Sequence, residues 1–115
     1  MLADHHIHII LDGADWRTAI AAHRDGPNEA IVRQRLRAYQ AAGVTYLRDG
    51  GDRWGVCLLA ARLAPEYGIR YAAPGAPLYP AGRYGGFLGR GFAGCGEFRC
   101  LVAENKQSGA DFIKL

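Results

Sequence analysis

The sequence has no long apolar run, no basic block and no framework of paired cysteines. No stretch of its 115 residues approaches the roughly 20 apolar residues that cross a bilayer, and its start lacks the blocks of a secretory signal. The three cysteines are an odd number at spacings that match no zinc module. We therefore expect a cytoplasmic protein with free thiols and no membrane partner.

The charge of the chain is modest and dispersed. Lysine and arginine together number 14 against 11 aspartates and glutamates, which gives a net charge of +3 at pH 7. The arginines are scattered rather than gathered in one block, so the sequence predicts no nucleic-acid partner. Hydrophobic residues make up 50% of the chain, which is typical of a globular domain with a core. We expect a small-molecule substrate, and assembly as a homo-oligomer stays open.

Helical and strand-like segments alternate along the chain. Helical patterns near residues 15–23, 28–42, 54–67 and 97–108 are separated by strand-like runs at 7–11, 44–47, 69–73 and 110–115. Three of the helical patterns end in a glycine that directly precedes a strand-like run: Gly43, Gly68 and Gly109. Residues 74–96 are rich in glycine, proline and aromatics and are predicted to be one long irregular loop.

This alternation predicts an α/β fold with parallel strands and right-handed helical crossovers. A complete (β/α)8 barrel needs about 250 residues, whereas four predicted strands already use the whole chain. We therefore expect the first half, about four βα units, of a TIM-type barrel that is truncated after its fourth strand. Residues 1–115 would then be one partial barrel domain with no separate second domain.

Asp4, His6 and His8 alternate along the chain, so in an extended strand their side chains share one face. Two imidazoles at positions i and i+2 can converge on one divalent cation through neutral ring nitrogens, as in zinc sites. The plainer interpretation is a pair of ordinary polar residues near the start of the chain. His5 points to the opposite face and is expected to pack or hydrogen-bond behind the strand.

Lys114 lies within the apolar run 112–115, where a charged ammonium would be poorly solvated. Burial favours the neutral amine, which can react with carbon dioxide to give a carbamate able to bridge two metal ions. Alternatively, the stem of Lys114 follows apolar surface and leaves the charge in water. The residue by itself does not decide between these two interpretations.

Three segments, in their order and spacing, resemble the amino-terminal half of the amidohydrolase superfamily: DHHIH at 4–8, GVTYLRDGG at 43–51 and GADFIK at 109–114. The resemblance implies that His6, His8 and a carbamate on Lys114, derived from carbon dioxide, hold one or two divalent metal ions. Zinc is the first choice of metal, with manganese or iron as alternatives. Asp4 matches an acid that would orient a metal ligand.

The resemblance also implies a reaction, in which metal-activated water attacks an amide or cyclic amide C–N bond. The general acid/base, an aspartate, and further histidine ligands would lie downstream, so we expect this chain alone to be inactive. Arg48 and Asp49 follow the second predicted strand, where a barrel binds its substrate, and they are predicted as substrate-binding residues. They could equally pair with one another or with loop backbone.

Two other functions remain open. A metal-dependent phosphoesterase of the polymerase-and-histidinol-phosphatase type also opens with H-x-H and often has an acidic residue and a glycine soon afterwards, as in Asp12-Gly13. That class gives no role to Lys114. The other is a non-catalytic fragment with residual metal binding.

Overall fold

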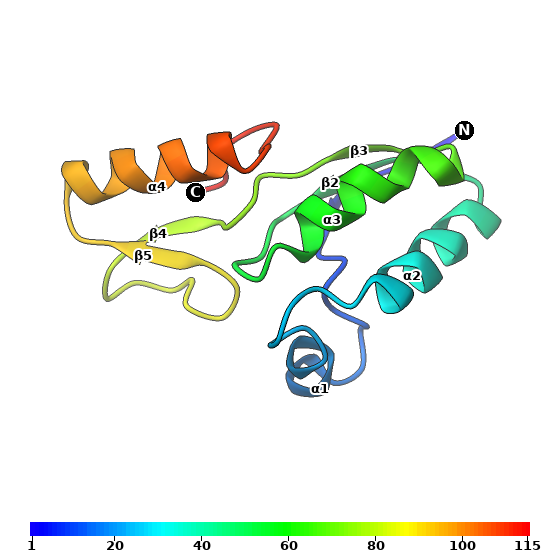
Figure 1. Cartoon of the computed structure of the whole chain (residues 1–115), viewed down its shortest axis with the longest axis horizontal. Coiled ribbons are helices and arrows are strands. Elements are labelled where there is room, and N and C mark those ends of the chain that lie inside the picture. Colours follow the sequence, from blue (N-terminus) through cyan, green and yellow to red (C-terminus); the bar gives the residue numbers. More distant parts are fainter.

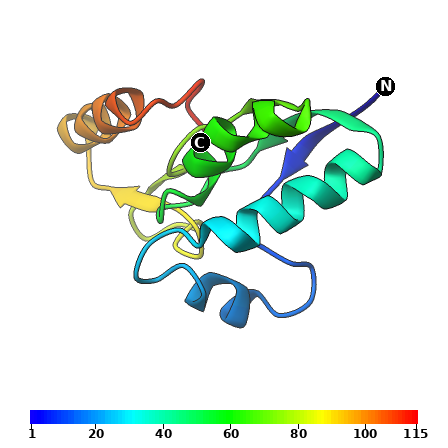
Figure 2. The same cartoon turned by 45° about the vertical axis from the view of Figure 1, so that its right-hand side comes forward.

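Three parallel strands form the main sheet of the computed structural model, which describes residues 1–115 (Figure 1). They stand in the order β1 (Leu2–Ile7), β2 (Val44–Asp49) and β3 (Arg70–Ala72). The connecting helices α2 (Glu29–Ala41) and α3 (Val56–Leu63) pack on each other and lie on the same side of the sheet (Figure 2). The carboxyl ends of all three strands therefore meet at one edge of the sheet.

A second group of elements lies at that end of the molecule. Strands β4 (Leu78–Pro80) and β5 (Arg90–Phe92) form a separate parallel pair, and helix α4 (Cys95–Gln107) packs against β5. The short helix α1 (Trp16–Ala21) lies beneath the start of α2 in both views (Figures 1 and 2). Even α2 and α4, with 13 residues each, fall short of the length and apolar character needed to cross a bilayer.

The helix ends follow from the local sequence. Asp15 accepts hydrogen bonds from the first turn of α1, and Asn28 does the same for α2. Helix α3 stops before Pro65, and the chain continues as one 3-10 turn, η1 (Ala64–Tyr67), because proline has no N–H to donate. Gly68 then ends η1 with a φ of 69°, in the left-handed region that glycine adopts without strain.

The core fills the space between the main sheet and its two helices. The side chains that are fully inaccessible there come from both helices, from β2 and from the turn after β1: Ile10, Val32, Leu36, Leu47, Val56 and Ala60. Burying a valine- or leucine-sized side chain contributes roughly 1.5–3 kcal/mol relative to exposure. Val32 and Leu36 form the buried face of α2.

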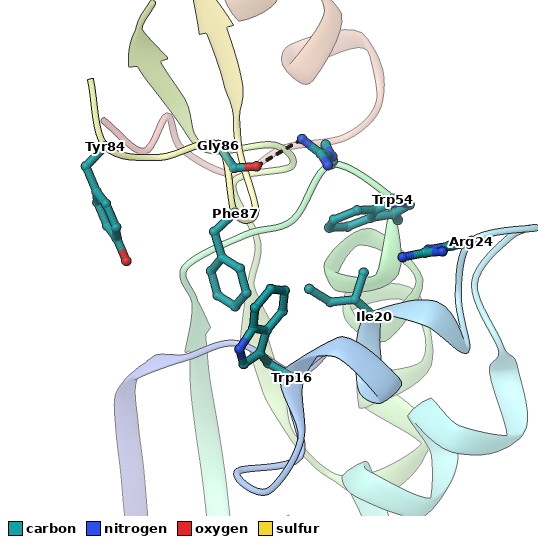
Figure 3. Close-up of a pocket in the computed structure, with 8 residues that line it drawn as sticks. Trp16, Ile20, Arg24, Trp54, Tyr84, Gly86 and Phe87 are labelled. Atoms are coloured by element: carbon teal, nitrogen blue, oxygen red, sulfur yellow. Dashed lines mark hydrogen bonds between the residues drawn. The ribbon is translucent and has the colours of Figure 1, made fainter. Parts of the chain in front are cut away.

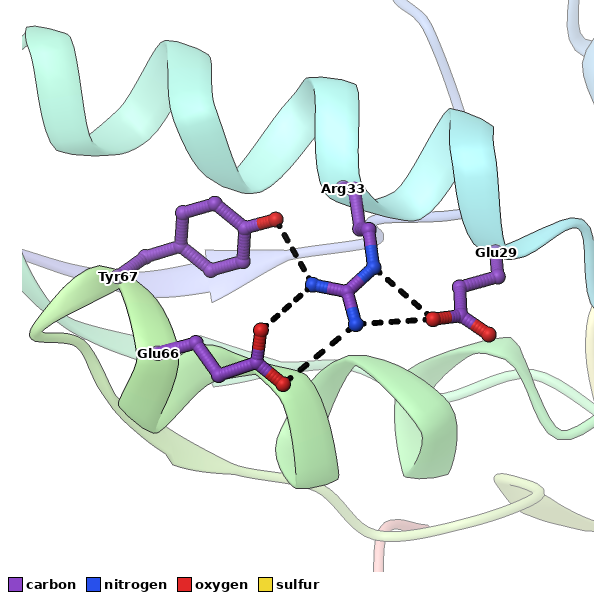
Figure 4. Close-up of polar contacts among 4 residues, drawn as sticks. All are labelled: Glu29, Arg33, Glu66 and Tyr67. Carbon is purple, nitrogen blue, oxygen red and sulfur yellow. Dashed lines mark hydrogen bonds and ion pairs between the residues drawn. The ribbon is translucent and has the colours of Figure 1, made fainter.

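Arg33 joins α2 to η1 at the surface (Figure 4). Its guanidinium donates to Glu66 at 2.7 Å, to the Tyr67 hydroxyl at 3.1 Å and to Glu29 at 2.9 Å. The hydrogen bond that Arg33 donates to Glu66 raises the pKa of Arg33, and Arg33 in turn lowers the pKa of Glu66. Because both carboxylates are exposed, water screens these ion pairs, and their main effect is to fix how η1 sits on α2.

The prediction of half a (β/α)8 barrel is wrong. The main sheet has three strands rather than four, and residues 110–115 contain no strand. Part of the predicted loop 74–96 instead forms β4 and β5, which pair with each other and not with the main sheet. The chain is an α/β domain built from two small parallel sheets and four α-helices.

The fourth predicted strand fails because its neighbouring segment cannot offer a continuous row of donors. Residues 110–115 do run beside β3 and β4: Asp111 N donates to Ala73 O at 2.7 Å, and Leu78 N donates to Lys114 O at 2.9 Å. Between Ala73 and Leu78, however, the chain contains two prolines, which have no N–H. Only isolated hydrogen bonds form, and the apolar run stays irregular.

The first strand is also placed differently from the prediction. Of the expected strand at residues 7–11, only Ile7 lies in a strand, and the following residues form a turn in which Leu11 N donates to His8 O at 2.9 Å. The pairing of β1 with β2 ends at Ile7, opposite Asp49. The apolar character of the segment reflects burial of Ile9 in the core rather than strand structure.

Candidate functional site

His8 directly follows β1, and the turn after β2 holds its ring. The Nδ1 atom of His8 lies 2.9 Å from the carbonyl oxygen of Gly51. Because a carbonyl oxygen only accepts, the hydrogen bond requires a proton on Nδ1, and the neutral ring then has a free lone pair on Nε2. Metal-binding histidines have this arrangement, with one nitrogen on the metal and the other fixed by a carbonyl or carboxylate.

Gly50 leaves the space that the His8 ring occupies. A Cβ atom added at Gly50 would lie 2.3 Å from Cε1 and 2.5 Å from Nε2 of His8. Gly50 N also donates to Ile7 O at 2.7 Å, which holds the turn against the end of β1. The first glycine therefore provides the close approach and Gly51 provides the acceptor, two roles that the sequence pattern did not reveal.

Asp49 lies beneath this turn and is 2% exposed. Its carboxylate accepts hydrogen bonds from Ile9 N at 3.2 Å, from Gly51 N at 2.7 Å and from the Tyr71 hydroxyl. Burial raises the pKa of Asp49, whereas the hydrogen bonds from Tyr71, Gly51 and Ile9 oppose that rise by favouring the ionised form. The residue predicted to bind substrate thus contacts backbone and Tyr71, and it positions the turn that holds His8.

His8 and Lys114 line the same cavity, which has a volume of about 340 Å³. Gly50 forms part of its wall, and Leu88 and Phe87 lie on the wall as well. Lys114 is half-buried, and its backbone is fixed by the hydrogen bond from β4. Two residues singled out at opposite ends of the sequence are therefore brought together, although the strand expected to carry Lys114 does not form.

His6 lies next to His8 on the exposed side. The two ring centroids are 5.4 Å apart with an interplanar angle of 58°. Asp4 contacts the backbone of His6 rather than its ring, since its carboxylate accepts a hydrogen bond from His6 N at 3.1 Å. The two imidazoles are close enough for side-chain rotation to bring both onto one cation.

Arg48 and His5 lie away from this cavity. The exposed guanidinium of Arg48 stacks on the Phe112 ring, 4.3 Å from its centroid. The His5 ring contacts that of Tyr46, with centroids 5.2 Å apart. The packing predicted for His5 behind the strand is what the structure has.

A metal site at His6 and His8 would have to take Lys114 as its third protein ligand. No three His, Cys, Asp or Glu side chains are grouped closely enough to hold a metal ion. His8 offers a free, oriented ring nitrogen, His6 a second imidazole, and Lys114 a further donor on the cavity wall. Imidazole and carboxylate-like ligands suit zinc, and manganese and iron accept the same types.

Comparison with known proteins gives one partial match. A segment of 68 residues, 59% of this chain, is 36% identical to the tRNA 5-methylaminomethyl-2-thiouridine biosynthesis bifunctional protein MnmC of Paraburkholderia phymatum. This chain spans 10% of the length of that protein, so the match does not establish a family. No protein-family model and no solved structure matches the chain.

Replacing Gly50 with alanine should displace the His8 ring. The added Cβ overlaps the ring, so we expect a loss of about 1–3 kcal/mol in the free energy of unfolding and a changed His8 ring signal in NMR spectra. The matched control is Gly96→Ala, because nothing lies within 4 Å of a Cβ at that position in α4. Equal stabilities for the two variants would contradict this account of Gly50.

The buried Asp49 should make the effect of Tyr71→Phe depend on pH. Burial raises the pKa of Asp49 in the folded state. The stability that the Asp49 carboxyl contributes is therefore fully present below the ordinary carboxyl pKa and is lost as the pH rises through the pKa of the folded state. The Tyr71 hydroxyl offsets that loss by donating to the ionised carboxylate. Tyr71→Phe should therefore cost about 1–3 kcal/mol at pH 7 and clearly less at pH 4 in urea unfolding. Tyr46→Phe is the control, and a cost for Tyr71→Phe that is the same at both pH values would refute the coupling.

Proposed function

We propose that this chain contributes the metal-binding residues of a metal-dependent hydrolase of the amidohydrolase type, in which metal-activated water attacks an amide or cyclic amide C–N bond. The observation that carries the proposal is that His8 and Lys114 line one cavity. Gly50 leaves room for the His8 ring in the wall of this cavity, and the Gly51 carbonyl fixes the ring there. The adjacent ring of His6 supports it. The three residues are those that the sequence resemblance selects.

His6 and His8 would hold the ion through ring nitrogens, and Lys114 would complete the set as a carbamate. The lysine amine would attack the carbon of carbon dioxide with loss of one proton from the nitrogen, and the carboxylate-like oxygens of the carbamate would serve as metal ligands. A bound divalent ion would lower the pKa of water and polarise the carbonyl under attack. The chain's own part is to orient the His8 ring and to keep Lys114 partly shielded from water.

The activity is proposed for a longer polypeptide, with this chain inactive alone. No aspartate or glutamate side chain lines the cavity of His8 and Lys114, so the general acid/base aspartate would come from other residues. We further propose a small-molecule substrate. We also propose a cytoplasmic location, because three unpaired cysteines favour a reducing compartment.

Other functions make different demands on the same residues. A phosphoesterase would use the histidine pair without needing Lys114, and turnover of phosphate esters but not cyclic amides by the longer protein would favour it. A role in tRNA modification has the partial match to MnmC in its favour. Binding of this chain to tRNA with an affinity that is insensitive to His8→Ala would support that role and count against the hydrolase.

Metal binding should depend on the neighbouring rings of His6 and His8. We expect the chain to bind Zn²⁺ in calorimetric titration, and His8→Ala to weaken binding at least tenfold by removing the oriented ring nitrogen, with a comparable loss in His6→Ala. The matched control is His5→Ala, which removes an imidazole from the opposite face and should bind normally. Unchanged affinity in His8→Ala, or an equal loss in His5→Ala, would exclude the proposed site.

The carbamate can be tested because the chain contains only two lysines, Lys106 and Lys114. With ¹³C-labelled bicarbonate and zinc, we expect a carbamate carbon signal in NMR spectra that disappears in Lys114→Met. Lys106→Met is the control, since Lys106 is exposed on α4 and should not affect the signal. A signal that persists in Lys114→Met, or no signal in zinc-loaded protein, would rule out the carbamate role.

A further inference from the structure

The largest cavity of the molecule lies outside the candidate metal site, between α1, the turn after β2 and the segment between β4 and β5 (Figure 3). Its volume is about 690 Å³, which is the size of pockets that bind small molecules. The wall includes the side chains of Trp16, Ile20, Arg24, Arg53, Trp54 and Phe87. Tyr84 lies at the rim and is 94% exposed.

Aromatic side chains form the walls of this cavity. Trp16 and Phe87 meet edge to face, with ring centroids 4.7 Å apart and an interplanar angle of 86°. Trp54 comes from the other side, and Ile20 lies between the two tryptophans (Figure 3). Rigid aromatic rings on facing sides of a cavity favour a flat, apolar ligand group that can stack or pack edge-on.

The charge of the cavity is positive. Arg24 and Arg53 are among its lining residues and no aspartate or glutamate is. Arg53 is partly engaged, because one of its nitrogens donates to Gly86 O at 3.0 Å while the guanidinium covers the Trp54 ring. Arg24 takes part in none of the ion pairs of the structure, which involve Arg33 and Arg90, and in Figure 3 it lies at the edge of the cavity beside Trp54.

We propose that this cavity binds a small aromatic anion, a planar ring that carries one carboxylate or phosphate group. The ring of the ligand lies between the Trp16–Phe87 pair on one side and Trp54 on the other. Its anionic group pairs with Arg24, whose guanidinium can donate two parallel hydrogen bonds to such a group. The proposal does not rest on the metal site, because none of its ligand contacts involves His6, His8 or Lys114.

The two tryptophans of the chain, Trp16 and Trp54, both line this cavity, so intrinsic fluorescence reports on it directly. The titrations use metal-free protein in a chelator. We expect phenylacetate and phenyl phosphate to change the emission with dissociation constants of about 1 mM or lower. Comparison of the two shows which anionic group is preferred. Benzyl alcohol, which lacks the charge, and cyclohexylacetate, which lacks the aromatic ring, should each bind at least fivefold more weakly.

Arg24→Gln should weaken binding of both anions about tenfold and leave binding of benzyl alcohol unchanged. The matched control is Arg17→Gln, which removes an equal charge that covers the Trp16 ring but does not line the cavity, and it should retain normal affinity. An absence of any emission change, equal binding of neutral and anionic probes, or equal losses in the two variants would overturn the proposal. Tight binding of an RNA oligonucleotide, weakened equally by both variants, would also overturn the proposal, because it would indicate a diffuse basic surface rather than a pocket for small anions.

Discussion

The hydrogen bonds of the buried Asp49 carboxylate join the carboxyl ends of the strands, and the rest of the site depends on them. One side chain at the end of β2 accepts from the backbone after β1, from the turn after β2 and from Tyr71 on β3. Without these donors, a buried carboxylate would lower the stability of the folded state. With them, the Asp49 carboxylate fixes three chain segments relative to one another. The turn that contains Gly50 and Gly51 is held in this way, and that turn sets the orientation of His8.

The two cavities of interest share a wall. Tyr84 and Phe87, from the segment between β4 and β5, line both the cavity of His8 and Lys114 and the larger aromatic one. The small second sheet therefore has a clear consequence for function, because pairing of β4 with β5 places this segment over the edge where the strands of the main sheet end. The proposed metal site and the proposed anion-binding cavity are therefore neighbours.

The sequence was informative where a local rule decides the structure. Asp15, Asn28 and Gly68 have the side chains or backbone freedom that helix ends require, and the helices begin and end accordingly. The sequence was misleading where the structure of a segment depends on residues that are distant in the sequence. Apolar residues at 110–115 look like a strand, but the two prolines opposite them prevent continuous pairing, and nothing local in the run reveals this.

The same distinction holds for the site. The alternation of His6 and His8 predicted neighbouring rings, and the two rings are neighbours. The position of Asp49 at the end of a strand left two predictions open, substrate binding or contact with loop backbone. Its contacts with Ile9 and Tyr71, residues distant in the sequence, were not predicted. The aromatic cavity was not predicted, because Trp16, Trp54 and Phe87 come from three separate segments with no shared pattern.

The Gly51 carbonyl fixes the His8 ring and leaves Nε2 free to bind a ligand. Long-range ¹H–¹⁵N NMR correlation spectra of the metal-free chain at alkaline pH report which ring nitrogen of His8 carries the proton. We expect a single tautomer with the proton on Nδ1 and the lone pair on Nε2. A ring protonated on Nε2, or one that exchanges rapidly between the two tautomers, would contradict it.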